Sequence, residues 1–161
     1  MDGTNRACFS LGSNIRPEQN LPAAVACLRA YGRIAAISSV WETRAVGSDG
    51  PNFLNLSLLI LTDCRAELLK ETIVRPVEAR LGRVRSDDKN APRTIDVDPL
   101  IYNDRPLTLR IWEMPFLAVP TAEIAPQLAH PETGETLSDA AARVKLTAWI
   151  RQRSDLFTGR D

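Results

Sequence analysis

One stretch of this sequence governs how the rest is interpreted: Pro92-Arg93-Thr94-Ile95-Asp96-Val97-Asp98-Pro99-Leu100-Ile101-Tyr102. It is rich enough in apolar and β-branched residues to predict a strand over residues 94–102. Side chains alternate between the two faces of a strand, so Asp96 and Asp98 leave by the same face, roughly 6–7 Å apart. Ile95 and Val97 leave by the opposite face, where they can pack on a core.

Two neighbouring carboxylates repel each other and raise each other's pKa unless a cation compensates their charge. A hard divalent ion that also binds a polyphosphate is a common partner for such a pair, and Arg93 adds a guanidinium nearby. A half-exposed edge strand with an acidic outer face has the same pattern. The D-x-D motif alone therefore leaves both interpretations open.

The chain has 161 residues, which suits one domain, expected here over residues 1–161. Lys and Arg balance Asp and Glu at 20 each, so the overall charge favours neither nucleic acid nor a membrane as a partner. The cysteines Cys8, Cys27 and Cys64 are dispersed and predict neither a disulfide framework nor a zinc site. No apolar run has the pattern of a signal peptide or a membrane span, so we expect a cytoplasmic protein without an obligate protein partner.

The order of the expected elements predicts the fold class. Apolar patterns predict strands over residues 7–11, 34–43, 53–62 and 94–102, with helices over residues 18–31 and about 63–81. Pro76 interrupts the second helix, which either kinks there or begins anew. This β-α-β-β-α-β order is typical of an α+β, ferredoxin-like sandwich with an antiparallel sheet. Extra C-terminal helices are expected over residues 121–128 and 138–151, the last with Ser138 as its N-cap.

Six motifs along the chain occur in an order that is shared with a known family. They are Leu11-Gly12-Ser13-Asn14, the loop at 43–47, Asn52-Phe53-Leu54-Asn55, Glu78 with Leu81-Gly82-Arg83-Val84-Arg85, the 92–102 stretch, and Glu123-Ile124-Ala125-Pro126. Over residues 7–137 the chain thereby resembles the 6-hydroxymethyl-7,8-dihydropterin pyrophosphokinase (HPPK) family. The resemblance implies the same ferredoxin-like fold and an enzyme of folate biosynthesis, which transfers diphosphate from ATP to a pterin alcohol and releases AMP.

The resemblance also implies roles for the charged residues. Asp96 and Asp98 would hold two Mg²⁺ ions that bridge the phosphates of ATP, the co-substrate. Arg83 and Arg93 would contact those phosphates, because the planar fork of arginine suits phosphate oxygens. The nucleotide site would be completed by Glu78, Arg85 and Arg110. The polar loop at 84–91 would close over the active site as a lid, although its charges alone are equally those of a solvated basic stretch.

A pterin ring is flat and carries donors and acceptors along one edge, so its pocket needs aromatic faces and an amide or backbone groups. Phe53 and Asn55 stand two apart on one expected strand and share a face. Taken alone, Phe53 is better explained as a core residue, whereas a buried Asn55 must find hydrogen-bond partners. The resemblance implies a substrate pocket formed by Thr43, Val46, Phe53, Asn55, Asp96 and Phe116.

The stretch at 109–116 departs from the family pattern, which has a Pro-His pair there and an arginine shortly before the stacking phenylalanine. This chain has Leu109-Arg110-Ile111-Trp112-Glu113-Met114-Pro115-Phe116, without histidine. Arg110 is the nearest replacement for the lost cation, and His130 is expected to be a surface or loop residue. In the basic loop, Lys89-Asn90-Ala91 stands where the family often has an aromatic residue.

Three functions remain open at this stage. The first is diphosphate transfer to 6-hydroxymethyl-7,8-dihydropterin. The second is the same chemistry on a related pterin alcohol, as in a methanopterin-type pathway. The third is a non-catalytic ferredoxin-like module that binds a ligand or serves as a scaffold. The complete set of Asp96, Asp98, Arg83 and Arg93 favours an enzyme over the third function.

Overall fold

The computed structural model describes residues 4–47 and 49–156, and within them a seven-stranded sheet forms the centre of the molecule. The strands follow the order β6-β5-β1-β4-β3-β7, and β2 also pairs with β4. All these pairs are antiparallel, which confirms the predicted α+β class. The strand bounds are β1 (Asn5–Ser13), β2 (Arg33–Ile37), β3 (Trp41–Thr43), β4 (Phe53–Thr62), β5 (Asp96–Tyr102), β6 (Arg105–Pro106) and β7 (Ile150–Gln152).

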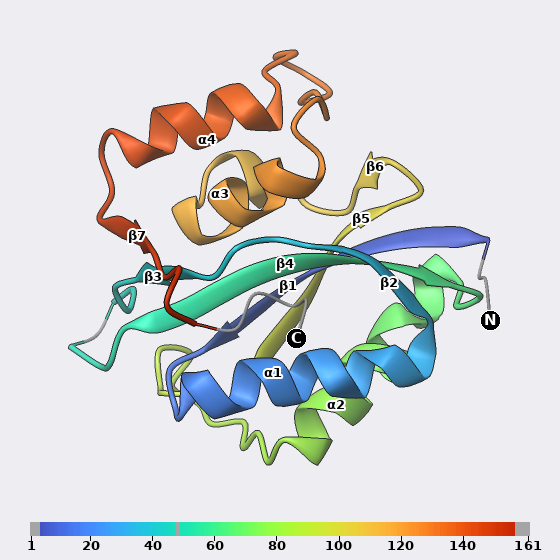
Figure 1. The fold of residues 1–161 in the computed structure, drawn as a ribbon, viewed down its shortest axis with the longest axis vertical. Helices are drawn as coiled ribbons and strands as arrows, with labels where there is room; N and C mark the ends of the chain where they lie inside the picture. Colours follow the sequence, from blue (N-terminus) through green and yellow to red (C-terminus); the bar gives the residue numbers. More distant parts are fainter. Residues whose placement is uncertain (1–3, 48, 157–161) are drawn as a thin grey trace.

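Helices cover both faces of this sheet (Figure 1). On one face lie α1 (Pro17–Leu28) and α2 (Arg75–Arg80), and on the other lie α3 (Pro115–Ile124) and α4 (Leu137–Lys145). One buried apolar cluster includes Phe9, Leu11 and Ile95, a second includes Leu59 and Trp112, and a third, smaller one lies between α3 and α4. Burial on both faces explains why β4 reads as an almost continuous apolar run.

The predicted core of the sheet is confirmed, with small shifts at its edges. The bounds of β4 are those predicted, β1 extends beyond the predicted 7–11, and β5 begins two residues later than expected. The single strand predicted over 34–43 is divided into β2 and β3. The division falls where Ser38 leaves the regular ladder, since its hydroxyl accepts a hydrogen bond from the backbone N–H of Ser57 at 2.8 Å.

The helical segment before Gly82 is continuous but irregular. A 3₁₀ turn at Ala66–Leu68 and a π-helical turn at Lys70–Val74 precede α2. Pro76 lies in the first turn of α2, where a missing backbone N–H leaves no hydrogen bond broken. Of the two predicted outcomes, the second applies: a new α-helical segment, α2, begins at Arg75, one residue before Pro76.

The C-terminal predictions are wrong in their bounds. The helix expected over 121–128 instead spans α3, because Pro115 begins it at a position where proline is favoured. The last helix begins at Leu137, and its N-cap is Thr136 rather than Ser138, since the Thr136 hydroxyl accepts from the backbone N–H of Asp139 at 3.2 Å. That helix ends at Lys145, and residues 150–152 form β7.

Among residues 4–47 and 49–156, no helix combines the length and the apolar character that crossing a membrane requires.

Candidate active site

Three neighbouring strands present a row of polar positions on the face covered by α3. In the antiparallel register, Gly12 of β1 lies between Asn55 of β4 and Asp96 of β5. Ser10, two residues along the same face of β1, lies opposite Asp98. The intervening residues of these strands point into the core beneath α1 and α2, as predicted for Ile95 and Val97, which are buried. Period-two alternation in three strands therefore gathers the predicted amide and both predicted carboxylates on one surface.

Gly12 keeps the middle of this row open. A Cβ atom at position 12 would lie 3.2 Å from Oδ1 of Asn55 and 3.7 Å from the ring of Phe53. Any side chain there would therefore crowd the amide and occupy the space between the amide and Asp96.

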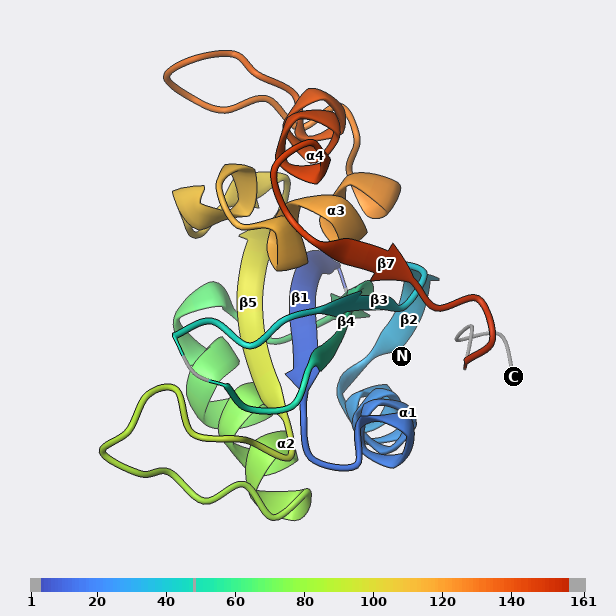
Figure 2. The same ribbon diagram turned by 90° about the vertical axis from the view of Figure 1, so that its left-hand side faces the viewer.

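A cavity of about 380 Å³ lies over the row. Figure 2 shows that the loop before β4 and the loop before β5 extend on the same side of the sheet, and residues of both loops line the cavity. Its lining consists of Ser10, Gly12, Thr43, Arg44, Val46, Phe53, Asn55, Lys89, Asn90, Arg93, Asp96, Asp98, Arg110, Met114 and Phe116. One cavity thus combines carboxylates, cations, an amide and aromatic rings.

Asp96 is held between two arginines. Nη1 of Arg83 donates to one carboxylate oxygen at 2.9 Å, and Nη1 of Arg93 donates to the other at 3.1 Å. Arg93 is itself fixed by Asn14, whose side-chain oxygen accepts from the Arg93 backbone N–H at 2.8 Å. Its guanidinium lies 5.9 Å from the centre of the Phe53 ring. This arginine therefore links the acidic side of the cavity to its aromatic side.

Asp98 lies in a less compensated environment than its neighbour. Burial, together with the charge of Asp96, raises the pKa of Asp98 to about 6, while Arg110 and Arg83 act in the opposite direction. The surrounding cations thus fail to offset the combined effect of desolvation and the second carboxylate. A further cation at this position would favour the ionised form of Asp98.

The carboxylate of Glu78 holds Arg83 and Arg85 in place. This buried carboxylate accepts from Nη1 of Arg83 and from Nη2 of Arg85, the latter at 2.9 Å. It also accepts from the backbone N–H of Val97 at 3.0 Å, in the strand between the two aspartates. One carboxylate in α2 therefore fixes both the start of the basic loop and the position of the acidic strand.

The opposite side of the cavity is centred on a neutral amide, with Arg44 as a cation at its rim. Nδ2 of Asn55 donates to Oγ1 of Thr43 at 2.9 Å and to the backbone oxygen of Trp41 at 3.2 Å, so the predicted partners of this buried amide exist. Phe53 flanks Asn55 on the same strand face, and Phe116 comes from the first turn of α3. Val46, largely exposed, belongs to the loop that closes this side.

The donor set fits Mg²⁺ as an ion shared with a polyphosphate. No group of three or more His, Cys, Asp or Glu suited to a metal occurs in the part of the chain that the structure describes. Mg²⁺ commonly binds through one or two carboxylates together with substrate phosphates and water. Asp96 and Asp98 lie on one face of β5 in this cavity and would supply the protein ligands of such a site.

Most of the predicted site residues line this cavity, and three lie behind or beside it. Arg83 and Arg85 line an adjoining cavity of about 400 Å³, which shares Lys89 and Arg93 with the first, and Glu78 is buried beneath them. His130 lies outside both cavities, with its ring centre 5.0 Å from that of Trp112. The lining residues that sequence reasoning missed are Ser10, Gly12, Arg44, Lys89, Asn90 and Met114.

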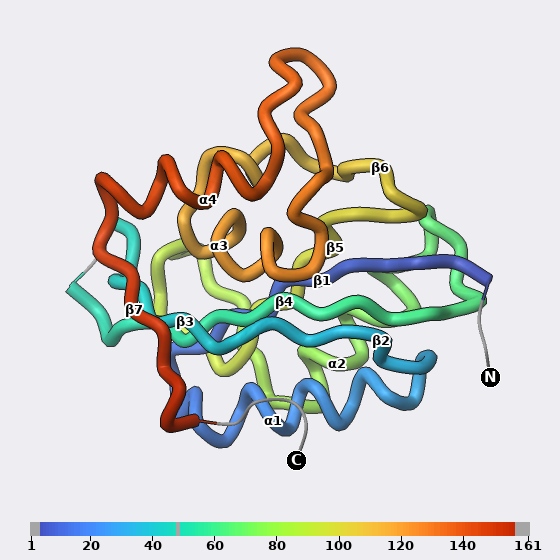
Figure 3. The backbone as a smooth tube through the Cα atoms, turned by 45° about the horizontal axis from the view of Figure 1, so that its top comes forward, coloured from blue at the N-terminus to red at the C-terminus, as the bar shows by residue number. Residues whose placement is uncertain are grey.

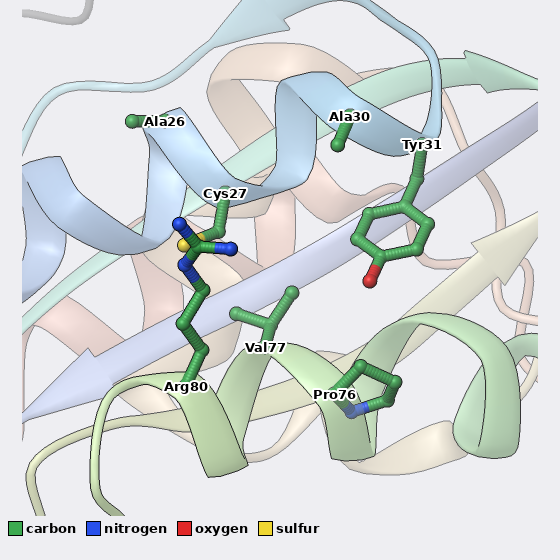
Figure 4. A pocket seen from close by; sticks show the side chains of 7 residues that line it. All are labelled: Ala26, Cys27, Ala30, Tyr31, Pro76, Val77 and Arg80. Atoms are coloured by element: carbon green, nitrogen blue, oxygen red, sulfur yellow. The ribbon is translucent and has the colours of Figure 1, made fainter.

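A separate cavity of about 250 Å³ lies on the other face of the sheet, between α1 and α2 (Figure 4). Its lining is Ala26, Cys27, Ala30, Tyr31, Pro76, Val77 and Arg80. It contains no carboxylate and none of the predicted site residues. The chemistry indicated by the sequence therefore belongs to the cavity over β1, β4 and β5.

Comparison with known proteins identifies the family of this chain. Residues 8–126 match the family model of 7,8-dihydro-6-hydroxymethylpterin-pyrophosphokinase (HPPK). The 2-amino-4-hydroxy-6-hydroxymethyldihydropteridine pyrophosphokinase of Synechocystis sp. is 34% identical over 153 residues, covering 88% of this chain and 77% of the relative. The enzyme of the same name from Methylorubrum extorquens is 38% identical over 151 residues, covering 86% and 93%.

A structural relative supports the fold. The crystal structure of Plasmodium falciparum HPPK-DHPS superimposes with a TM-score of 0.68 at 13% identity, over 88% of this chain and 44% of that longer one. The two sequence relatives and the match of residues 8–126 together establish the family: this chain is a member of the 7,8-dihydro-6-hydroxymethylpterin-pyrophosphokinase family.

Proposed function

We propose that this protein transfers the diphosphate of ATP to the hydroxymethyl group of 6-hydroxymethyl-7,8-dihydropterin, with release of AMP, as a step of folate biosynthesis. The names of the relatives support this activity. The observation that carries it is the composition of one cavity, in which the Asp96 and Asp98 carboxylates face the Asn55 amide across Gly12. One side of the cavity offers charged groups for a polyphosphate, and the other offers aromatic rings and an amide for a flat heteroaromatic alcohol.

In this reaction the substrate hydroxyl loses its proton to water, and its oxygen forms a bond to the β-phosphorus of ATP. The bond from that phosphorus to the oxygen shared with the α-phosphate breaks, and AMP leaves. Phosphoryl-type transfer is catalysed mainly by positioning and by stabilising charge on the phosphate oxygens. We assign the positioning of the phosphates to Arg83 and Arg93, with Arg85 and Arg110 as further contacts. Arg83 and Arg93 are already oriented by Asp96.

We assign Mg²⁺ binding to Asp96 and Asp98. When bound, Mg²⁺ would neutralise part of the phosphate charge and orient the β-phosphate toward the alcohol. Glu78 would act on the nucleotide site through Arg83 and Arg85, because both guanidinium groups donate to its carboxylate. The loop at 84–91 would close over the bound nucleotide, a role supported by its exposed, charged residues between Arg83 and Arg93.

For the pterin we assign stacking to Phe53 and Phe116 and edge recognition to Asn55. The amide of Asn55 uses its N–H groups within the protein, so its oxygen remains available to accept from a ring donor. Thr43 and Val46 would line the same edge. Asp96 would reach the alcohol group, since it adjoins both Gly12 and the phosphate side of the cavity.

The test is a coupled assay for AMP. Purified protein with ATP, Mg²⁺ and 6-hydroxymethyl-7,8-dihydropterin should release AMP and form the pterin diphosphate, and both products should be absent when the alcohol is omitted. Turnover only with a different pterin alcohol would contradict the substrate assignment. Absence of AMP with every pterin alcohol would contradict the proposed activity.

A further inference from the structure

The last strand of the structure pairs with the strand that begins the substrate loop. β7 lies antiparallel to β3, with Ile150 opposite Thr43, Arg151 opposite Glu42 and Gln152 opposite Trp41. Figure 3 shows the chain returning after α4 to run beside β3. This segment lies beyond residue 126, where the family match ends.

One carboxylate ties the C-terminal segment to both ends of the loop at 44–51. Oε1 of Glu42 accepts from Nη2 of Arg151 at 2.9 Å and from Nη1 of Arg153 at 2.8 Å. Oε2 of the same carboxylate accepts from Nδ2 of Asn52 at 2.8 Å. Glu42 precedes the loop and Asn52 follows it, so the loop is anchored where it leaves and where it rejoins the sheet.

An aromatic contact holds the first residue of the loop. The guanidinium of Arg44 lies 5.3 Å from the ring centre of Trp149, and that of Arg151 lies 6.0 Å from it. Arg44 also lines the active-site cavity, as does Val46 two residues later. Among the described residues, no carboxylate forms an ion pair with Arg44. Its contact with Trp149 is therefore the interaction that the structure provides for holding this cation at the cavity rim.

We propose that residues 149–153 form a C-terminal clamp that sets the affinity for the pterin substrate, with Trp149 as a positioning residue acting through Arg44. The inference rests on the proposed function, because the clamped loop is the wall assigned to the pterin. A surface loop that is ordered before binding loses less conformational freedom when the ligand arrives, which favours binding without altering the chemical step. The clamp thus affects the binding of the pterin, whereas phosphate transfer depends on the opposite wall, which contains Asp96 and Asp98.

The first experiment separates binding from chemistry. Trp149→Ala should raise the KM for the pterin alcohol about three- to tenfold, while kcat and the KM for ATP change less than about twofold. Trp149→Phe keeps a ring beneath Arg44 and should remain within about twofold of the wild type. Leu146→Ala is the matched control, since Leu146 is 86% exposed in the same connecting segment.

Coupling to Arg44 is tested with a double-mutant cycle. Adding Trp149→Ala to Arg44→Ala should change the KM for the pterin by less than about twofold. Additive effects of the two substitutions would contradict action through Arg44. A fall in kcat with an unchanged KM in Trp149→Ala would contradict the clamp as a device for affinity.

A second readout does not depend on catalysis. Trypsin cleaves after arginine, and stacking on Trp149 should protect the Arg44–Ala45 bond. Mass spectrometry of brief digests should show this bond cleaved several times faster in Trp149→Ala, relative to the Arg85–Ser86 bond in the other exposed loop. An unchanged ratio would overturn the clamp even if the protein is a pterin kinase. A raised ratio in a protein without turnover would overturn the proposed function, and with it the effect on pterin affinity, but would support the contact by which Trp149 holds Arg44.

Discussion

The two walls of the active-site cavity are built by different kinds of interaction. The charged wall consists of Asp96 and Asp98 with the arginines around them, and burial works against ionised Asp98 there. The neutral wall is centred on Asn55, whose amide N–H groups both find acceptors within the protein. The charged wall is thus arranged for a ligand that the fold does not contain, whereas the neutral wall also stabilises the fold.

This difference predicts opposite consequences for stability. Removing the Asp98 carboxylate from the charged wall should weaken function and leave the folded protein as stable as before, or more so, because burial and the charge of Asp96 both disfavour its ionised form. Removing the amide from the neutral wall should weaken both recognition and folding, because buried partners lose their hydrogen bonds. The following substitutions test that contrast, beginning with the largest expected effect.

Asp96→Ala should lower kcat/KM by about a thousandfold or more, because it removes a carboxylate that we assign to Mg²⁺ and the group that orients Arg83 and Arg93. Steady-state assays of AMP release measure this loss. Asp63→Ala is the control, since Asp63 is an exposed aspartate just after β4. If Asp96→Ala keeps wild-type turnover with Mg²⁺, the charged wall is not the catalytic wall. A large fall in melting temperature would instead mean that Asp96 serves the fold.

Asp98→Asn should stabilise the metal-free protein at pH 7.5 by about 2–3 kcal/mol. The raised pKa of Asp98, about 6, means that the native state holds a proton which the unfolded chain has already released above about pH 4. Stability of the wild type should therefore fall as the pH rises from about 4 to 6, and the Asn variant should lack this part of the fall.

The measurement for Asp98→Asn is urea unfolding in EDTA at pH 4 and pH 7.5. The variant and the wild type should nearly converge at the lower pH, where Asp98 is protonated in the native state and about half protonated in the unfolded chain. An Asn variant that is less stable than the wild type at pH 7.5 would show that the ionised carboxylate supports the fold, and the contrast between the walls would fail.

Asn55→Ala should affect both properties at once. It removes the donor to Thr43 and Trp41, so the free energy of unfolding should fall by about 2 kcal/mol. Loss of the amide should also raise the KM for the pterin by tenfold or more, with little change in the KM for ATP. Gln127→Ala, at an exposed turn, is the control. Unchanged stability combined with a higher pterin KM would mean that Asn55 serves only pterin binding and does not stabilise the fold.

Arg110→Ala should have the smallest effect of the four. The residue lines the cavity, and its charge acts on Asp98, so we expect the KM for ATP to rise about tenfold, with the pterin KM and the stability little changed. The control is Arg105→Ala in β6, an exposed arginine on the neighbouring hairpin. A silent Arg110→Ala would mean that another cation replaces the histidine that the family pattern has in this region.

Local patterns in the sequence predict the centre of the sheet well. β4 is a largely apolar run, interrupted only by Asn55 and Ser57 before it ends at Thr62, and the alternation around Asp96 and Asp98 fixes which face each side chain takes. These features depend on the period of a single strand, which a sequence displays directly. The motifs shared with the family then indicated which of those faces carries the chemistry.

The pairing and register of distant strands could not be predicted from these local patterns. The position of Gly12 between Asn55 and Asp96 depends on the register of three strands, and a shift of one residue in any of them would reverse its faces. β7 was missed for a similar reason: Ile-Arg-Gln has no strong strand pattern, and only its pairing with β3 makes it a strand. The start of α3 was predicted too late, because Pro115 occupies the first turn of the helix, where proline is favoured.

The pairing of β7 with β3 has a further consequence for the surface of the molecule. Without β7, one side of β3 would expose unpaired backbone donors and acceptors, and an open strand edge invites pairing with strands of other molecules. A chain shortened to the 126 residues at which the family match ends would lack this cover. By pairing with β3, β7 therefore prevents this edge of the sheet from pairing with the sheet of another copy.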